Sequence, residues 1–245
     1  MKYRLHSILE DKHGRKIKKI LKIIPSRINA MHFSEVEKLI GQAVEECNII
    51  KNEGIEIQDE GLANTAYLLR IYCSMWGSIS LFWKCAKSRE YEGAWFHLQD
   101  GIDRNNILSK NLEDESELNT YKIQQYLLAY EEVFPYNIFS SMGLTSTSCC
   151  SICKKDSFDN TCIHVPGRIY WGQMANTVIE TAEIKEISLT KTPEDKRCVP
   201  KKDDSFFSDV QRLFDYVGKP LNVLIYDEER RHVDVVFGDC ISVYD

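Results

Sequence analysis

The sequence lacks the short patterns that carry most familiar enzyme chemistry. It contains no glycine-rich phosphate loop, no His-Glu-x-x-His pair and no strand-to-helix nucleophile elbow. Histidine is also scarce, with 6 residues in a chain of 245. Because no complete catalytic set can be assembled, the sequence favours a non-enzymatic binding protein over an enzyme.

Leader-like and membrane-spanning segments are missing as well. The opening residues, MKYRLHSILEDKHGRK, meet charges before an apolar run of useful length develops, so we expect no signal peptide. The most apolar stretch, Leu62 to Trp83, carries Arg70 near its middle, and burying that charge in lipid would be costly. We therefore expect a core helix there and no membrane partner.

Cysteine is present in an odd number, 9, which does not suit a disulfide framework. Cys47, Cys73 and Cys85 lie in helix-like apolar stretches, where a reduced thiol behaves as a small hydrophobic side chain. Together with the missing signal peptide, this predicts a cytoplasmic protein without disulfides.

Charge is unevenly distributed. The chain has a net charge of −6, yet residues 1–27 carry nine Lys or Arg against Glu10 and Asp11. A basic segment can bind nucleic acid through its phosphates, here by Lys16, Lys18, Lys19 and Lys22, but no base-reading motif accompanies it. A solvated surface segment is the preferred interpretation.

The first half of the chain has helical patterning. Residues 1–29 are expected to form a basic hairpin or arm, with two strands joined at Asp11–Gly14, although Ile17, Ile20, Leu21 and Ile24 also fit an amphipathic helix. Apolar stripes over residues 30–134 predict a helical bundle. Its central helix should bury most of the following side chains: Leu68, Leu69, Ile71, Met75, Ile79 and Trp83. Trp76 and Trp95 are also interpreted as core residues.

After Pro135 the composition changes to short β-like runs. Residues 184–190 predict a strand, residues 206–220 a helix with Gly218-Lys-Pro220 as its stop, and residues 221–245 two or three antiparallel strands. The predicted fold class is therefore α+β, with the helical bundle followed by a zinc-stapled α+β domain over residues 135–245.

The stretch CCSICKKDSFDNTCIH, residues 149–164, gathers four cysteines and a histidine. Cys150 and Cys153 can converge around one tight turn, and Cys162 and His164 lie on one side of an extended chain. Three thiolates and one imidazole satisfy tetrahedral Zn²⁺ without an open position, which is typical of a structural site. The sequence therefore predicts one structural zinc ion.

Two further cysteines are possible ligands. Cys149 could replace Cys150, but its pairing with Cys153 would need a looser turn. Cys198 follows much later and is the reserve ligand if His164 is otherwise engaged, although an ordinary core thiol is the preferred interpretation. The zinc-finger-like set of Cys150, Cys153, Cys162 and His164 remains the best assignment.

The segment CSICKKDSFDNTCIHVPGRIYWG, followed by EISLTKTP, resembles a zinc-bearing segment of some tailed-phage capsid-assembly proteins of the prohead-protease or scaffold-like kind. Those proteins show Cys-x2-Cys, Cys-x-His-x2-Gly-x2-Tyr-x-Gly and a later Glu-Val-Ser strand. The likeness covers about residues 150–200, while the rest resembles uncharacterised bacterial proteins. It implies the same four ligands, with Gly167, Tyr170 and Gly172 shaping the turn beyond them.

Two functional hypotheses follow. The first is a zinc-stabilised interaction protein whose partner is another protein. The alternative is a hydrolase: a degenerate phage-type serine protease using Ser188, or a nuclease using the group from His97 to Asp103 with Asp100 and Arg104. His232, near Arg230 and Asp234, is interpreted as a surface histidine rather than a general base.

Overall fold

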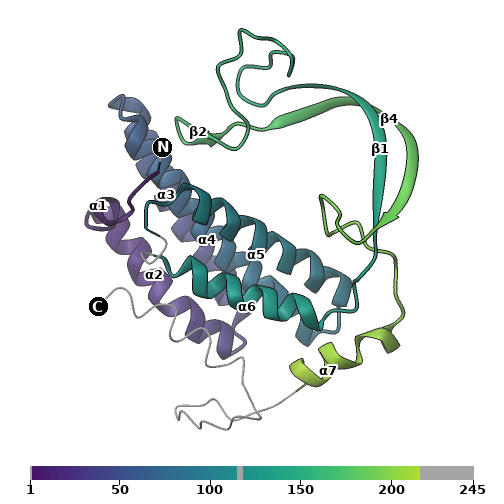
Figure 1. Cartoon of the computed structure of the whole chain (residues 1–245). Coiled ribbons are helices and arrows are strands. Elements are labelled where there is room, and N and C mark those ends of the chain that lie inside the picture. Colours follow the sequence, from purple (N-terminus) through teal and green to yellow (C-terminus); the bar gives the residue numbers. More distant parts are fainter. Residues whose placement is uncertain (1, 115–117, 216–245) are drawn as a thin grey trace.

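The computed structural model describes residues 2–114 and 118–215, and it confirms the α+β class. Six helices precede a long, curved two-stranded ribbon and a short hairpin (Figure 1). The chain then returns to the helices through a 3-10 turn and a last short helix. Within the described ranges, no helix combines the length and the apolar character that a membrane crossing requires.

The helical region is built around its longest helix. The helices are α1 (His6–Leu9), α2 (Lys12–Asn29), α3 (Phe33–Glu56), α4 (Glu60–Lys87), α5 (Tyr91–Asn111) and α6 (Thr120–Val133). Helix α4 contacts both α3 and α5, so it is buried on most of its sides. Its side chains Leu68, Leu69, Met75, Trp76 and Ile79 are fully buried, whereas Ile71 is only partly buried.

The predicted hairpin around Asp11–Gly14 is wrong, and the amphipathic helix is correct. The Asp11 carboxylate caps α2 by accepting a 2.6 Å hydrogen bond from the Gly14 amide. Gly14 does not supply a positive φ; it allows close packing, because a Cβ there would lie 2.0 Å from the Ile8 carbonyl oxygen. The apolar stripe of α2, including Ile17, Leu21 and Ile24, is buried.

The ribbon pairs β1 (Phe139–Cys150) with β4 (Thr177–Thr190) in antiparallel fashion. The predicted strand over residues 184–190 is therefore confirmed as the second half of a longer strand. The pairing contains two register shifts, at Gly143/Leu144 and at Thr147/Ser148. A small hairpin, β2 (Ile169–Tyr170) with β3 (Gln173–Met174), lies between the two long strands in sequence.

Both ends of the ribbon are fixed to other parts of the chain. At the first end, Phe139 is buried and stacks near Trp95 of α5, with ring centroids 6.4 Å apart. At the second end, the hairpin reaches Asn64 of α4, whose Oδ1 accepts a 2.7 Å hydrogen bond from the Gly172 amide. The Asn64 Nδ2 also donates to the Tyr3 hydroxyl at 2.9 Å. The helical region thus positions the segment that carries the cysteines.

The segment after the ribbon packs back onto the helices. The 3-10 turn η2 (Asp204–Phe207) and α7 (Ser208–Phe214) bring Phe207 and Phe214 against aromatic rings of the bundle. Phe214 lies 4.9 Å from Trp83 and 5.4 Å from Phe82, centroid to centroid. The predicted helix after residue 205 is therefore present. Its stop at Gly218-Lys-Pro220 and the predicted strands of residues 221–245 lie outside the described residues.

Candidate metal centre

The first two candidate ligands lie at a tight turn where β1 ends. Cys150 is the last residue of β1, and the chain reverses so that the Lys154 amide donates to the Cys150 carbonyl at 2.9 Å. Lys154 closes the turn with a φ of 60°. The Cys150 amide in turn donates to the Lys155 carbonyl at 2.8 Å. This turn brings Cys153 back beside Cys150, as the spacing predicts.

The second pair of ligands is held by polar contacts within its own loop. The Asp159 carboxylate accepts a 2.8 Å hydrogen bond from the Thr161 amide, and the Cys162 amide donates to the Asp159 carbonyl at 2.9 Å. The Tyr170 and His164 rings pack edge to face, with their centroids 4.9 Å apart. The Tyr170 hydroxyl accepts a 3.0 Å hydrogen bond from the Val165 amide. Tyr170 therefore positions the imidazole.

Two glycines shape the chain beyond the ligands. Gly167 has a φ of 83° and Gly172 a φ of 71°, a region that favours glycine. At Gly172, a Cβ would also lie 2.5 Å from the Lys51 side chain and 3.1 Å from the Ala63 carbonyl oxygen. The turn-shaping role that the family resemblance implies for these two residues fits their backbone geometry.

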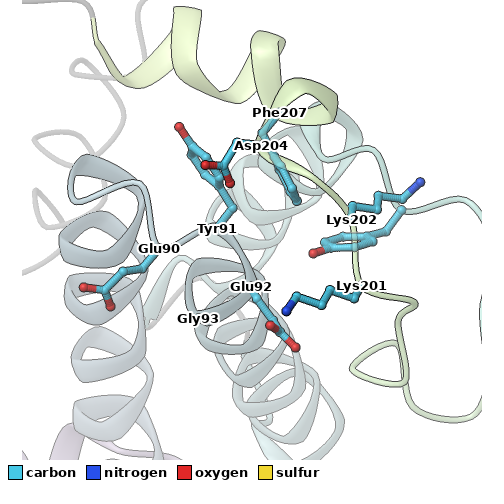
Figure 2. A pocket seen from close by; sticks show the side chains of 9 residues that line it. Glu90, Tyr91, Glu92, Gly93, Lys201, Lys202, Asp204 and Phe207 are labelled. Atoms are coloured by element: carbon cyan, nitrogen blue, oxygen red, sulfur yellow. The ribbon is translucent and has the colours of Figure 1, made fainter.

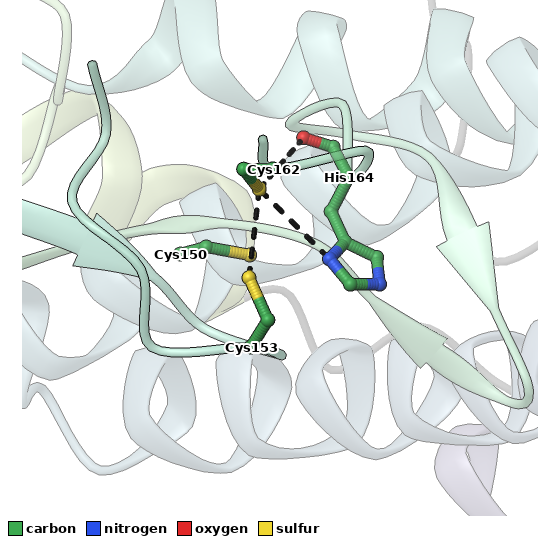
Figure 3. Close-up of side chains that lie close together, drawn as sticks. All are labelled: Cys150, Cys153, Cys162 and His164. Atoms are coloured by element: carbon green, nitrogen blue, oxygen red, sulfur yellow. Dashed lines mark hydrogen bonds between the residues drawn. The ribbon is translucent and has the colours of Figure 1, made fainter. Parts of the chain in front are cut away.

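The four donor atoms form one compact cluster that could hold a metal ion (Figure 3). All of them lie within 4.8 Å of one another. The Cys153 and Cys162 sulfurs are 3.5 Å apart, and the Cys162 sulfur is 3.9 Å from His164 Nδ1. Ligand bonds of the usual zinc lengths place tetrahedral donors about 3.5–3.8 Å apart. The Cys153–Cys162 and Cys162–His164 distances are close to these values.

The electrostatics of the cluster are compatible with a bound cation. Hydrogen bonds from backbone amides, first that of Cys153, lower the pKa of the Cys150 thiol despite its burial. The His164 amide lowers the pKa of Cys162, but burial and the neighbouring Cys153 and Cys150 sulfurs outweigh it, so the net shift is upward. A second thiolate beside the first is unfavourable until a positive ion compensates the charge.

Cys149 and Cys198 stand outside the cluster. Cys149 is buried next to the ligands, and burial together with the Glu180 carboxylate raises the pKa of its thiol. Cys198 lies at the other end of the ribbon, where its carbonyl accepts a 2.8 Å hydrogen bond from the Ser140 amide. Ser140 is ten residues before Cys150 in an extended strand, roughly 30 Å away. The geometry therefore does not support Cys198 as a reserve ligand.

The carboxylates considered for a nuclease are engaged in ion pairs. The Arg197 guanidinium donates to Asp100 Oδ1 at 2.7 Å and to Asp103 Oδ2 at 2.6 Å. Arg104 contacts Ser78 and lies 3.5 Å from Asp100. His97 is half-buried, and burial lowers its pKa. This arrangement ties the segment after β4 to α5 and leaves no pair of free carboxylates at this position.

The residues considered for a protease are not brought together. Ser188 is exposed on β4 opposite Ser141, near the Phe139 end of the ribbon, whereas His164 lies at the Cys150 end. Among the described residues, no hydrogen bond joins Ser188 to a histidine. His232 lies outside them.

Among the cavities formed by the described residues, two bear on the site. One, of about 360 Å³, lies between the start of α5 and the segment leading into η2 (Figure 2). Its lining mixes acidic Glu90, Glu92 and Asp204 with basic Lys201 and Lys202. A second, of about 420 Å³, opens beside Cys150, Cys162 and His164. The first has no matched set of metal donors, whereas the second adjoins the candidate metal centre.

Comparisons with protein-family models, curated proteins and solved structures gave no match to this chain. The resemblance of residues 150–200 to phage capsid-assembly proteins therefore remains an expectation from sequence. The candidate site rests on the chemistry and geometry of its own residues.

Proposed function

We propose that this chain is a zinc-stabilised interaction protein in which the metal centre is structural. The supporting observation is the cluster of Cys150, Cys153, Cys162 and His164 within 4.8 Å. Thiolate and imidazole donors in tetrahedral array favour Zn²⁺ over the oxygen-preferring Mg²⁺ and Ca²⁺. Four protein donors leave no coordination position for a water or a substrate, which supports a structural rather than a catalytic role.

The proposed centre would organise a loop that has little core of its own. Residues 151–168 are mostly exposed or half-buried, and the segment has few apolar contacts to fold around. When bound, zinc supplies the cross-link between the two ligand pairs, and structural zinc contributes on the order of 10 kcal/mol to the folding of small metal-binding units. Metal binding would therefore fix the conformation of this loop.

The fixed loop presents large apolar side chains to solvent. Phe158 is 88% exposed, Ile163 is 80% exposed and Val165 is 45% exposed; beyond the loop, Trp171 in the β2–β3 turn is also 45% exposed. Aromatic and aliphatic side chains on a rigid support are typical of protein-binding surfaces, because little conformational entropy is lost when they are buried. We therefore propose a protein partner for this loop.

Metal analysis of the purified full chain by native mass spectrometry tests the centre. We expect one zinc ion per chain under reducing, chelator-free conditions, a reduced zinc content in Cys153→Ser, and an unchanged content in Cys198→Ser. A chain without zinc, or a variant pair with equal zinc content, would contradict the proposal.

Comparative capture from the native cell tests the partner. A specific protein should bind the parent chain and be lost with Phe158→Ser/Ile163→Ser, whereas it should be retained by Phe206→Ser. Phe206 is 57% exposed on η2, away from the loop, so it controls for loss of a surface aromatic ring. Equal loss from both variants would argue against the loop as the binding surface.

A further inference from the structure

The strand register of the ribbon sorts its side chains onto two faces. Residues that pair across an antiparallel ladder project to the same side, and side chains along one strand alternate. Met142 pairs with Ile187, and Leu144 pairs with Ile184. Met142 and Leu144 are two residues apart in β1, so both pairs lie on one face.

The register shifts extend this face along the whole ribbon. Lys185 is an extra residue in β4 at the first shift, which lets Ile187 and Ile184, three residues apart, point to the same side. Glu180 is the extra residue at the second shift, and it aligns Ala182 with Ile179 in the same way. Without these bulges, strict alternation would place Ile184 on the face opposite Ile179 and Ile187.

The result is an exposed face that is apolar and uncharged. Its large side chains, with their exposed fractions, are Met142 (51%), Leu144 (40%), Ile179 (53%), Ile184 (57%), Ile187 (68%) and Leu189 (74%). The other residues of this face, among them Ser140, Ser146, Ser148 and Ala182, carry no charge. The opposite face is largely polar, and its residues include Ser141, Thr145, Thr147, Thr181, Glu183, Glu186 and Ser188.

Such a ribbon is unusual in water without a covering layer. An isolated pair of strands is marginally stable, and a monomer rarely leaves a large apolar patch exposed without a binding role. Here both ends are anchored, one by Phe139 near Trp95 and the other through the β2–β3 hairpin, whose Gly172 amide donates a hydrogen bond to Asn64 of α4. The apolar face is thus held in a defined shape before anything binds to it.

We propose that the apolar face of the ribbon packs against the same face of a second copy of this chain. This inference rests on the proposed function as an interaction protein. It adds that a second copy of the chain is the partner that binds the apolar face. Charge supports a second copy. The chain carries a net charge of −6, and the polar face would bring Glu183 and Glu186 near their own copies, whereas the apolar face meets itself without like-charge repulsion.

The area of the apolar face determines how tightly the dimer is expected to associate. A large surface patch covers about 300–600 Å², so two copies would bury roughly 600–1,200 Å² in total, at the low end of specific interfaces. Because the same patch serves both chains, the contact closes as a two-fold dimer and does not grow into a filament. We therefore expect a reversible dimer that dissociates in the micromolar range.

Analytical ultracentrifugation of the zinc-loaded full chain across the micromolar range tests the proposal. We expect a monomer–dimer equilibrium, at least tenfold weakened by Ile187→Lys. Ser188→Lys adds the same charge at the adjacent residue on the polar face and should leave the equilibrium unchanged. Both positions are exposed on β4, so neither change removes a core contact.

Amide exchange and metal content make the outcome decisive. Residues 177–190 should become more protected as the concentration rises. A zinc-loaded chain that stays monomeric, or equal effects of the two lysine variants, would overturn the dimer while leaving the metal centre in place. Protection of β4 that does not change with concentration would also overturn it, because a cover other than a second copy would then be present. If the purified chain forms the dimer but contains no zinc, the result would support the dimer and reject the proposed metal centre.

Discussion

At the residue scale, the Asn64 side chain links α4 to the β2–β3 hairpin and to Tyr3. It is 1% exposed, and its amide contacts Tyr3, the Ile169 carbonyl and the Gly172 amide. The partners are 61, 105 and 108 residues away in sequence, so no local pattern marks the residue. The four metal donors, in contrast, lie within fifteen residues and could be selected by spacing alone.

We expect Asn64→Ala to release the β2–β3 hairpin from α4. A buried donor or acceptor that loses its partner costs about 1–3 kcal/mol, here chiefly at the Gly172 amide. Thermal or chemical unfolding should show reduced stability, and exchange at Gly172 should accelerate. Asn52→Ala, at an exposed position of α3, should have almost no effect; an equal loss in both variants would contradict the role of Asn64.

Gly14 gives a second prediction at this scale, in which the sign of the change in unfolding free energy distinguishes helix propensity from packing. Helix propensity alone would make Gly→Ala stabilising by about 1 kcal/mol in a helix interior. At Gly14 the added methyl would overlap the Ile8 carbonyl, so we expect Gly14→Ala to lower the free energy of unfolding instead. Gly41→Ala in α3, where nothing lies within 4 Å of the added Cβ, should be stabilising. Chemical denaturation compares the two; two variants of the same sign would contradict the packing argument.

At the element scale, α2 is present where a basic hairpin was predicted. The lysines considered for nucleic-acid binding therefore lie on a helix that packs against α3. Lys16 is paired with the Glu46 carboxylate at 2.6 Å, and the Lys16 and His13 side chains lower the pKa of Glu46. Part of the positive charge is therefore neutralised by α3. A helix still presents several lysines together, as a phosphate-binding surface requires.

We expect little nucleic-acid binding by α2 at physiological salt. Binding at low salt should weaken steeply as salt rises, on every sequence tested, and replacing Lys16, Lys18, Lys19 and Lys22 with Gln should reduce it. The matched control replaces four exposed lysines elsewhere: Lys38, Lys84, Lys110 and Lys201. Fluorescence anisotropy over a salt series measures both. Tight, salt-resistant binding that survives the α2 changes would show that this electrostatic argument is wrong.

At the scale of the whole molecule, the structure separates two sources of stability. The helices share a continuous apolar core that includes aromatic residues from η2 and α7. The loop around the candidate metal centre has much less burial, and under the proposed function a bound metal ion stabilises it. Loss of metal should therefore affect one region far more than the other.

We expect chelation of the metal, or Cys153→Ser, to open residues 145–172 while the helical region keeps most of its helix signal. Hydrogen exchange followed by mass spectrometry would localise the change, and circular dichroism would report the helices. Cys198→Ser should leave the exchange of residues 145–172 unaltered. Simultaneous loss of helix signal and loop protection would instead indicate that the metal centre supports the entire fold.

The sequence by itself determined the features that depend on neighbouring residues. Apolar periodicity was sufficient to predict the helices of residues 30–134, although not that α2 packs with them, and short spacing was sufficient to select the cluster of Cys150, Cys153, Cys162 and His164. In the helices, apolar side chains recur on one face at each turn, and in the cluster the members of each ligand pair lie within three residues of each other. The geometry therefore follows from local chain stereochemistry.

Only the tertiary structure decided the features that depend on register and distant contacts. Bulges at Glu180 and Lys185 determine which isoleucines share a face, and a shift of one residue would exchange the two faces. Arg197 occupies the carboxylates of Asp100 and Asp103 from almost a hundred residues away. Such contacts form when separate elements pack, and their partners are set by the shape of the whole chain rather than by any local pattern.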